Sequence, residues 1–280
     1  MSSVSATPRV RRIQPSRRRV RLDLRELWAY RELLFFLIWR DVKVKYKQTA
    51  FGAAWAIIVP LVSTVVFTLV LHRGLHLKPE YKVPYPLFVF TAMLPWTYFT
   101  ACLSASSTSI VGNQSLITKV FFPRLIIPLG SVVAPVIDFL CAFTVLVGMF
   151  LWYGRTPHWH AIGIPFFLGM ALLTAFGVGL WLSALNVRYR DVPYAVPFLT
   201  TIWFFVTPIL WGITAVKPRT QTLLALNPMT GVIDGFRWAV LGKGLPHYGI
   251  YLESLGIGLA ITLSGLWYFK RVERYFADLI

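Results

Sequence analysis

Long uncharged stretches recur along the chain, and each has enough residues to cross a bilayer as a helix. About 20 apolar residues in helical form span the ~30 Å hydrocarbon core of a membrane. The pattern predicts six such spans: 51–71, 85–110, 127–153, 162–185, 194–213 and 250–269. Pro95 predicts a kink in the second span, because proline removes a backbone donor and crowds the preceding turn. We therefore expect an all-α polytopic membrane protein.

The segment 24–50, before the first span, has its apolar residues mainly on one helical face. This face carries Leu24, Leu27, Trp28, Leu34, Phe35, Ile38 and Val42. The pattern predicts an N-terminal amphipathic helix that lies in the membrane interface. Leu33, Phe36 and Leu37 make its middle apolar on nearly all sides, so a short seventh span is the alternative.

A further uncharged run, 220–233, lies between the fifth and sixth spans. Its 14 residues are too few to cross a bilayer, and Asn227 and Pro228 interrupt it. Broken backbone at membrane depth is tolerated where protein or a water-filled cavity satisfies its polar groups. We therefore expect re-entrant external helices here, with an amphipathic surface helix as the alternative.

Charge is concentrated near the N-terminus. Only 14% of the residues are charged, against about 25% in soluble domains. Of the 28 Lys and Arg residues, 13 fall between Arg9 and Lys47. The positive-inside rule places this region, and with six spans both termini, in the cytoplasm. The expected organisation is a basic cytoplasmic arm at 1–23, the amphipathic helix at 24–50, a transmembrane domain at 51–270 and a cytoplasmic tail at 271–280.

The basic arm also matches the composition of nucleic-acid-binding tails. Because it precedes a hydrophobic segment, we expect it to meet anionic membrane lipids, and no nucleic-acid partner is predicted.

The sequence contains none of the short motifs that mark a catalytic or nucleotide site. There is no GxxxxGK[ST], HExxH or GxSxG motif and no paired-carboxylate DxD motif. The histidines form two close pairs in predicted external loops, His72 with His76 and His158 with His160, without a clear third ligand. We expect no catalytic residues and no metal site.

Asp138 is the acid that the pattern places well inside a predicted span. An ionisable group in the hydrocarbon region is costly, which makes it a candidate functional residue. The alternative is a structural hydrogen bond to a neighbouring helix.

Four segments in the same order resemble ABC-2 polysaccharide-export permeases. They are KYKQTAFGAAW at 45–55 followed by Pro60, VFFPR at 120–124, NVRYRD at 186–191 and LNPM at 226–229. The resemblance covers nearly the whole predicted membrane domain, while the arm before Leu22 lies outside it.

This resemblance implies a homodimer in the cytoplasmic (inner) membrane that exports a lipid-linked polysaccharide such as O antigen, teichoic acid or capsule. Two copies of a separate ABC ATPase would bind ATP and Mg, and this chain would hold no cofactor. Lys119, Phe122, Pro123 and Arg124 would then couple ATPase closure to the spans.

By the same resemblance, three residues at the second cytoplasmic loop, Arg188, Arg190 and Asp191, would form a cytoplasmic gate or a headgroup site. They are equally explained as ordinary positive-inside anchors. Asn227 and Pro228 would help to close an external gate. The alternatives to polysaccharide export are an ABC-2 exporter for a drug or lipid, and a membrane glycosyl- or acyltransferase, which the missing catalytic constellation disfavours.

Overall fold

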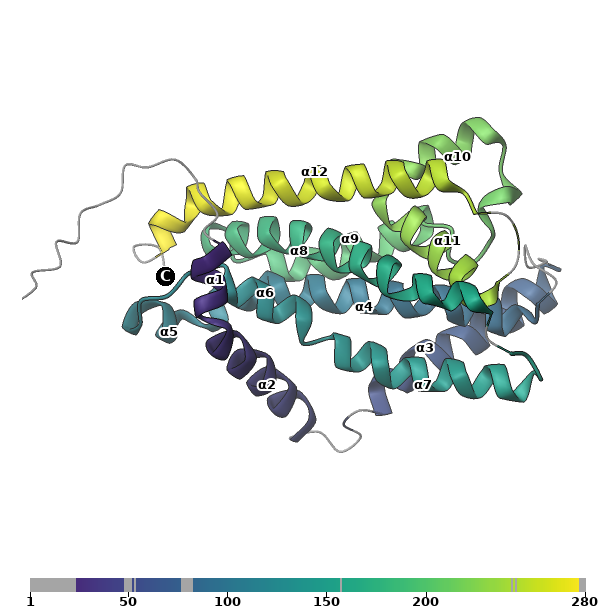
Figure 1. The fold of residues 1–280 in the computed structure, drawn as a ribbon, viewed down its shortest axis with the longest axis horizontal. Helices are drawn as coiled ribbons and strands as arrows, with labels where there is room; N and C mark the ends of the chain where they lie inside the picture. The colour runs from purple at the N-terminus through teal and green to yellow at the C-terminus, as the bar shows by residue number, and fades with distance from the viewer. Residues whose placement is uncertain are drawn as a thin grey trace, which may run out of the picture.

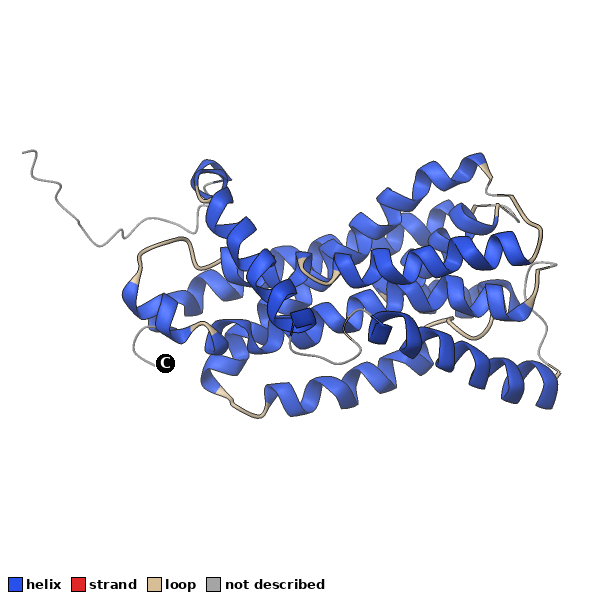
Figure 2. Cartoon of the chain, turned by 90° about the horizontal axis from the view of Figure 1, so that it is seen from below, coloured by secondary structure: helices blue, strands red, loops and turns tan. Residues whose placement is uncertain are grey.

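The computed structural model describes residues 24–47, 52, 54–76, 83–156, 158–242, 244 and 246–276. Within these ranges the regular elements are helices and there is no strand (Figure 2). The predicted arm, the end of the amphipathic segment at 48–50 and the last four residues of the predicted tail lie outside the described residues.

Five helical stretches of the described chain are long and apolar enough to cross a membrane. They are Ala54–Gly74, Tyr85–Gly112, Ile126–Trp152, Trp159–Arg188 and Tyr248–Tyr275. These stretches confirm the all-helical, multi-pass class. The predicted span 194–213 instead forms the shorter apolar helix α9 (Val192–Val206). Its 15 residues extend only about 22 Å at 1.5 Å per residue, and the chain leaves the helix at Thr207.

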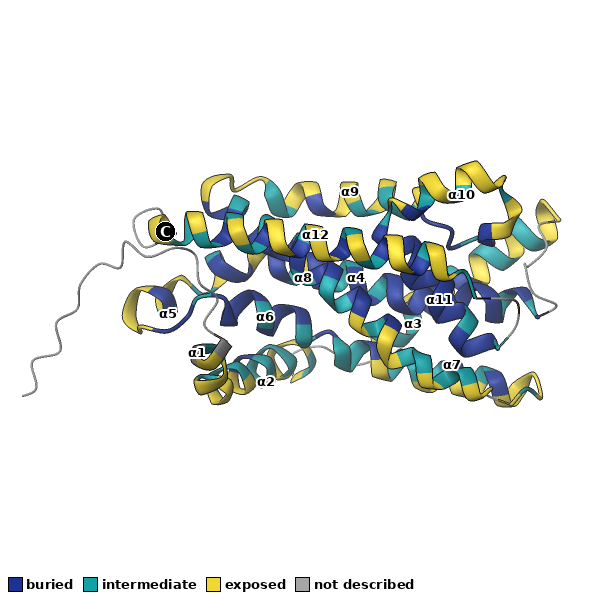
Figure 3. Ribbon diagram, turned by 45° about the horizontal axis from the view of Figure 1, so that its top comes forward, coloured by how far each residue is buried: buried dark blue, intermediate teal, exposed yellow. Residues whose placement is uncertain are grey.

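Helix α4 (Tyr85–Gly112) forms the centre of the bundle (Figure 3). It packs against α3 (Ala54–Phe67), α8 (Ile164–Arg188) and α9, and most of its side chains are buried. Helix α3 continues into the π-helical segment η1 (Thr68–Gly74), and of these two elements only Pro60 and Thr64 are buried. Pro95 lies inside α4 without ending it.

The third predicted span is interrupted. It forms α6 (Ile126–Val133) and α7 (Val136–Trp152), which meet at Ala134 and Pro135. Pro135 has no N–H to continue the helical ladder, and its ring crowds the preceding turn. The break places Asp138 in the first turn of α7.

Helices α8 and α12 (Tyr248–Val272) pack closely through small residues. A Cβ on Gly177 would lie 2.7 Å from Thr262 Cα, and one on Gly265 would lie 2.5 Å from the carbonyl oxygen of Gly177. Thr262 also donates a hydrogen bond to the carbonyl of Leu173 at 2.8 Å. Small residues and interhelical hydrogen bonds are the usual means of helix association in lipid.

The predicted amphipathic segment forms α1 (Leu24–Ala29) and α2 (Arg31–Lys47), which run outside the bundle near one end (Figure 1). Helix α2 packs on α6. Its buried contact is Leu37, 2% exposed. Of the predicted apolar face, Leu27 and Leu34 pack partly buried beside it, whereas Trp28 and Phe35 point away from the bundle at 70% and 68% exposure.

Short helices occupy both ends of the bundle (Figure 1). At the end with α1 lie α5 (Gln114–Lys119) and η4 (Glu273–Tyr275). At the other end lie η2 (Trp159–Gly163), η3 (Ile213–Ala215), α10 (Pro218–Ala225) and α11 (Pro228–Leu241). Gly242, with φ of 60°, ends α11 in the left-handed conformation that glycine adopts without strain.

Candidate functional site

Asp138 joins helix α7 to the C-terminal turn of α2. Its Oδ2 atom lies 2.6 Å from Lys45 Nζ, and its Oδ1 atom accepts a hydrogen bond from the Tyr46 hydroxyl. Burial of the phenol, followed by its hydrogen bond to Asp138, raises the pKa of Tyr46. Tyr46 therefore remains a donor at neutral pH, and the predicted intramembrane acid has both a cation and a neutral donor from a neighbouring helix.

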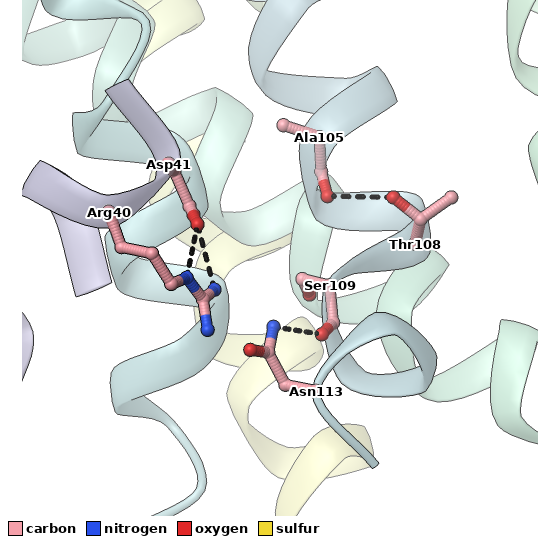
Figure 4. A network of polar contacts seen from close by, with 6 residues as sticks. All are labelled: Arg40, Asp41, Ala105, Thr108, Ser109 and Asn113. Atoms are coloured by element: carbon pink, nitrogen blue, oxygen red, sulfur yellow. Dashed lines mark hydrogen bonds and ion pairs between the residues drawn. The ribbon is translucent and has the colours of Figure 1, made fainter. Parts of the chain in front are cut away.

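A cavity of about 470 Å³ lies between α2 and the facing sides of α4 and α6. This volume falls within the range of small-molecule sites. Figure 4 shows its two walls, with Arg40 paired to Asp41 on α2 and with Thr108, Ser109 and Asn113 at the end of α4. We call this space the polar chamber.

The hydroxyl hydrogens of Thr108 and Ser109, and one amide hydrogen of Asn113, are directed to the backbone of α4. Thr108 Oγ1 donates to the Ala105 carbonyl at 3.3 Å, and Asn113 Nδ2 donates to the Ser109 carbonyl at 2.8 Å. Ser109 Oγ donates to the Ser106 carbonyl at 2.8 Å. The oxygen atoms of this wall are therefore available as acceptors.

A second cavity, of about 240 Å³, lies between α3, α4 and α7. Its lining is mainly apolar and aromatic, and includes Trp55, Val59, Pro60, Tyr98 and Phe139. We call it the aromatic chamber. Lys45, Ala101 and Asp138 line both chambers, so the ion pair stands between them.

The predicted coupling residues lie where α5 returns to α6. Phe122 is 5% exposed and Pro123 is also buried, whereas Lys119 and the neighbouring Phe121 face outward. Phe121 is 89% exposed, the highest value among the exposed large apolar residues of the described chain. The sequence resemblance pointed to Phe122 and missed Phe121, because two adjacent phenylalanines carry no signal of which one is buried.

Phe122 packs in a buried group that we call the basal cluster. Its members come from α2, α4, α5, α6, α8 and α12, and from the segments that flank α5 and α12: Leu37, Ile110, Ile117, Phe122, Leu125, Ile126, Ile127, Leu180, Ala184, Val187, Phe269 and Phe276. Arg124 adds a polar tie, since it donates a hydrogen bond to the Glu273 carbonyl and its guanidinium lies 5.9 Å from the Phe276 ring centroid. The α5–α6 connection is therefore packed against both the amphipathic helix and the C-terminal helix.

The second predicted loop group, Arg188, Arg190 and Asp191, is exposed at the turn between α8 and α9. The Arg188 guanidinium lies 5.4 Å from the Tyr189 ring centroid. No salt bridge within the described ranges involves these three residues. These three residues lie together because they are near neighbours in the sequence. Their role as a gate or headgroup site stays a prediction.

Asn227 fixes the start of α11 to the end of α9. Its Oδ1 atom accepts from Trp203 Nε1 at 2.8 Å and from the Met229 N–H at 3.0 Å. Its Nδ2 atom donates to Thr207 Oγ1 at 2.8 Å. Asn227 is thus an N-cap that also holds the neighbouring helix, and Pro228 follows at the first helical position, where its missing N–H costs nothing.

Arg237 is the main residue of this region that the sequence analysis missed. It is 1% exposed and donates hydrogen bonds to the backbone carbonyls of Pro208, Ile209 and Trp211. Its guanidinium also lies 3.8 Å from the Phe88 ring centroid. These carbonyls belong to the non-helical segment after α9, so the arginine supplies donors that a longer helix would otherwise have supplied.

Asp234, one turn before Arg237, is also buried and was not singled out. Its Oδ2 atom lies 2.8 Å from His247 Nδ1. In the sequence, Asp234 and Arg237 stand three positions apart just after the uncharged run 220–233. This spacing marks both as candidate buried polar residues, but it does not identify the groups that each one contacts.

No group of three metal-binding side chains occurs among the residues that the structure describes. His72 stacks on Tyr85 with centroids 5.0 Å apart, and His158 stacks on His160 at 4.6 Å. His160 also meets Trp238 edge-on at 4.5 Å. These histidines pack as aromatic rings at the end of the bundle.

Comparison with known proteins gives a family match over most of the chain. The family described as "ABC-2 type transporter" matches residues 32–241. A Myxococcus xanthus protein named "O-antigen export system permease protein RfbA" is 27% identical over 92% of this chain and 98% of its own length. A Klebsiella pneumoniae protein of the same name is 29% identical over 89% of this chain and 95% of its own length.

A more distant relative is the Escherichia coli "Polysialic acid transport protein KpsM". It is 21% identical over 81% of this chain and 88% of its own length.

Proposed function

Because the chain belongs to the ABC-2 type transporter family, we propose that it is the membrane permease subunit of an ATP-driven exporter of lipid-linked polysaccharide. The observation that carries the proposal is end-to-end similarity to relatives named as O-antigen export permeases, which spans 89% and 92% of this chain. O antigen, teichoic acid and capsule are the cargo classes we consider. A drug or lipid exporter remains the second candidate within the same family.

The proposed topology has six spans, with α9 as the fifth. Helix α9 is too short to cross alone, and the segment 207–212 would complete the crossing with its carbonyls held by Arg237. Helices α10 and α11 would then form the re-entrant external region, and α1 with α2 would lie in the cytoplasmic interface. The cytoplasmic side of the inner membrane would hold both termini, including the 1–23 arm and the 271–280 tail.

The distribution of basic residues supports this orientation. Lys119, Arg124, Arg188, Lys270 and Arg271 all lie at the end of the bundle that carries α5 and η4 (Figure 1). Excess Lys and Arg in short loops marks the cytoplasmic side.

The α5–α6 connection is the proposed contact for the ATPase. Lys119 and Phe121 offer a cation and an exposed ring to the partner, while Phe122, Pro123 and Arg124 carry its movement into the basal cluster. Two ATPase copies would serve a homodimer of this chain, and they would bind ATP and Mg. This permease is therefore not an enzyme by itself.

At the opposite end, Asn227 and Pro228 would help to form the external gate. The support is that Asn227 bonds to both α9 and α11, so that a movement of α11 must alter the end of the fifth span. On the cytoplasmic side, Arg188, Arg190 and Asp191 would form a gate or headgroup contact, for which their exposure and charge are the support.

Deleting the gene for this chain tests the proposed function in the cell. We expect lipid-linked polysaccharide to accumulate on the cytoplasmic side and the corresponding surface polymer to disappear. An unchanged surface polymer together with increased sensitivity to a drug would favour the second candidate.

A further inference from the structure

The two chambers differ in chemistry although they share a boundary. The polar chamber has charged side chains on α2 and hydroxyl or amide oxygens on α4, whereas aromatic and aliphatic side chains line much of the aromatic chamber. A single ligand that occupies both must therefore have a polar head and a hydrocarbon part.

The charges in the polar chamber are paired. Arg40 Nη2 lies 2.7 Å from Asp41 Oδ1, and Lys45 lies 2.6 Å from Asp138. The lining therefore carries no net charge, which selects against a strongly anionic head. The acceptor oxygens of Thr108 and Ser109 suit an uncharged head that carries several hydroxyl groups.

The boundary between the chambers is the position for a phosphate. The Lys45 side chain is 56% exposed and lies in the linings of both chambers, while Asp138 is 15% exposed behind it. A lysine ammonium binds phosphate as a point charge. A phosphate at this boundary would compete with Asp138 for Lys45.

We propose that the two chambers form one site for a phosphate-linked amphiphile. Its hydroxyl-rich head occupies the polar chamber, its phosphate contacts Lys45, and the first part of its hydrocarbon tail lies beside Trp55 and Val59 of α3. Two lipids share this chemistry: a sugar joined through phosphate to a polyprenyl chain, and phosphatidylglycerol. The first case rests on the proposed polysaccharide export and would make the site a loading position for cargo.

The test measures binding of two fluorescent probes, polyprenyl-phosphate hexose and phosphatidylglycerol, to the purified full-length chain in detergent. Lys45→Gln removes the phosphate contact and is expected to weaken binding by about tenfold, the size of a charge-assisted hydrogen bond. Lys43→Gln is the matched control, because Lys43 lies on the same helix but lines neither chamber. Its binding should match that of the unaltered chain.

Asp138→Asn separates a binding role from a structural one. It removes the competitor for Lys45, so binding should tighten severalfold, opposite to the effect of Lys45→Gln. If the ion pair only holds α2 in place, both substitutions will weaken binding alike, and that result would overturn the proposal. Equal affinities of Lys45→Gln and Lys43→Gln would also overturn it.

Photocrosslinking leaves the Lys45–Asp138 ion pair intact, so its result does not depend on whether the Lys45 and Asp138 variants fold correctly. A photoreactive residue at Thr108, in the polar chamber, should crosslink to the probe head, whereas one at the exposed Thr222 of α10 should not. Equal crosslinking at both positions would contradict the site.

The two probes distinguish the two lipid sources. Preferential binding of the hexose lipid supports cargo loading, and preferential binding of phosphatidylglycerol supports a membrane-lipid site. If ATP-driven glycan export is observed but neither probe binds, the proposed function stands and the site does not.

Discussion

Arg124 donates a hydrogen bond to the backbone carbonyl of Glu273, which ties the α5–α6 connection to the end of the C-terminal helix. Phe276, beside this contact, is fully buried against Phe269 with ring centroids 5.2 Å apart. A movement of the α5–α6 connection is therefore expected to displace the C-terminal end of α12 as well. This contact makes the C-terminal turn part of the proposed coupling apparatus.

Breaking this tie should weaken the transport-coupled ATPase activity of the complex. Arg124→Glu places a carboxylate beside the Glu273 carbonyl and is expected to lower transport-coupled ATPase activity severalfold without preventing membrane insertion. Arg274→Glu, which makes the same charge change in η4 beside the contact, is the control. Unaltered coupling in Arg124→Glu would remove the loop from the coupling role.

The adjacent phenylalanines of the loop should respond differently to alanine. Phe121→Ala removes an exposed ring and is expected to weaken ATPase association while leaving the melting temperature unchanged. Phe122→Ala opens a cavity in the basal cluster and should destabilise the fold by about 3–5 kcal/mol. Pull-down of the ATPase and thermal unfolding distinguish them, and equal melting temperatures for the two variants would contradict the burial of Phe122.

Arg237→Met should destabilise the end of the bundle that holds α10 and α11. The substitution leaves the buried carbonyls of Pro208 and Ile209 and the partly buried carbonyl of Trp211 without this donor, and each buried unsatisfied group costs about 1–3 kcal/mol. Arg219→Met in the exposed helix α10 is the matched control. A protease-accessibility assay on the 207–228 region should show faster cleavage only in the first variant, and equal rates would contradict the role of Arg237.

Close packing of α8 on α12 should be sensitive to any side chain at Gly177. Gly177→Leu would force its Cβ into the backbone of Thr262, so assembly of the bundle should fail or its melting temperature should fall sharply. Gly169→Leu on the same helix, where a Cβ meets nothing within 4 Å, should be tolerated. Similar expression levels and melting temperatures of the two variants would contradict the close packing of α8 on α12 at Gly177.

The sequence was sufficient for the features that depend on hydropathy and on local breaks. Apolar length predicted the membrane class, and Asn227 with Pro228 marked the point where α10 ends and α11 begins. The predicted span 127–153 was placed correctly, but its interruption at Pro135 was missed. Proline is tolerated inside α4 at Pro95, so its presence alone did not identify the helix that would break.

Tertiary partners account for the other differences. Helical periodicity put Trp28, Phe35, Leu27 and Leu34 of the amphipathic segment on one face. Leu27 and Leu34 do pack partly buried against the basal cluster, but Trp28 and Phe35 face outward, and the fully buried residue is Leu37, outside the predicted face. In a membrane protein an apolar face can meet lipid as well as protein, so periodicity does not determine which side packs inward. The ion pair of Asp138 with Lys45 joins residues that are 93 positions apart. Local sequence patterns do not predict a contact over such a distance along the chain.

Reconstitution with the partner ATPase tests the central claim most directly. The permease and the ATPase are placed in vesicles that carry a lipid-linked polysaccharide, and the glycan that reaches the opposite leaflet is measured with and without ATP. The account predicts movement that requires ATP, the ATPase and this chain together. Glycan movement without any ATPase, or ATP hydrolysis by the complete complex with no glycan movement, would contradict it.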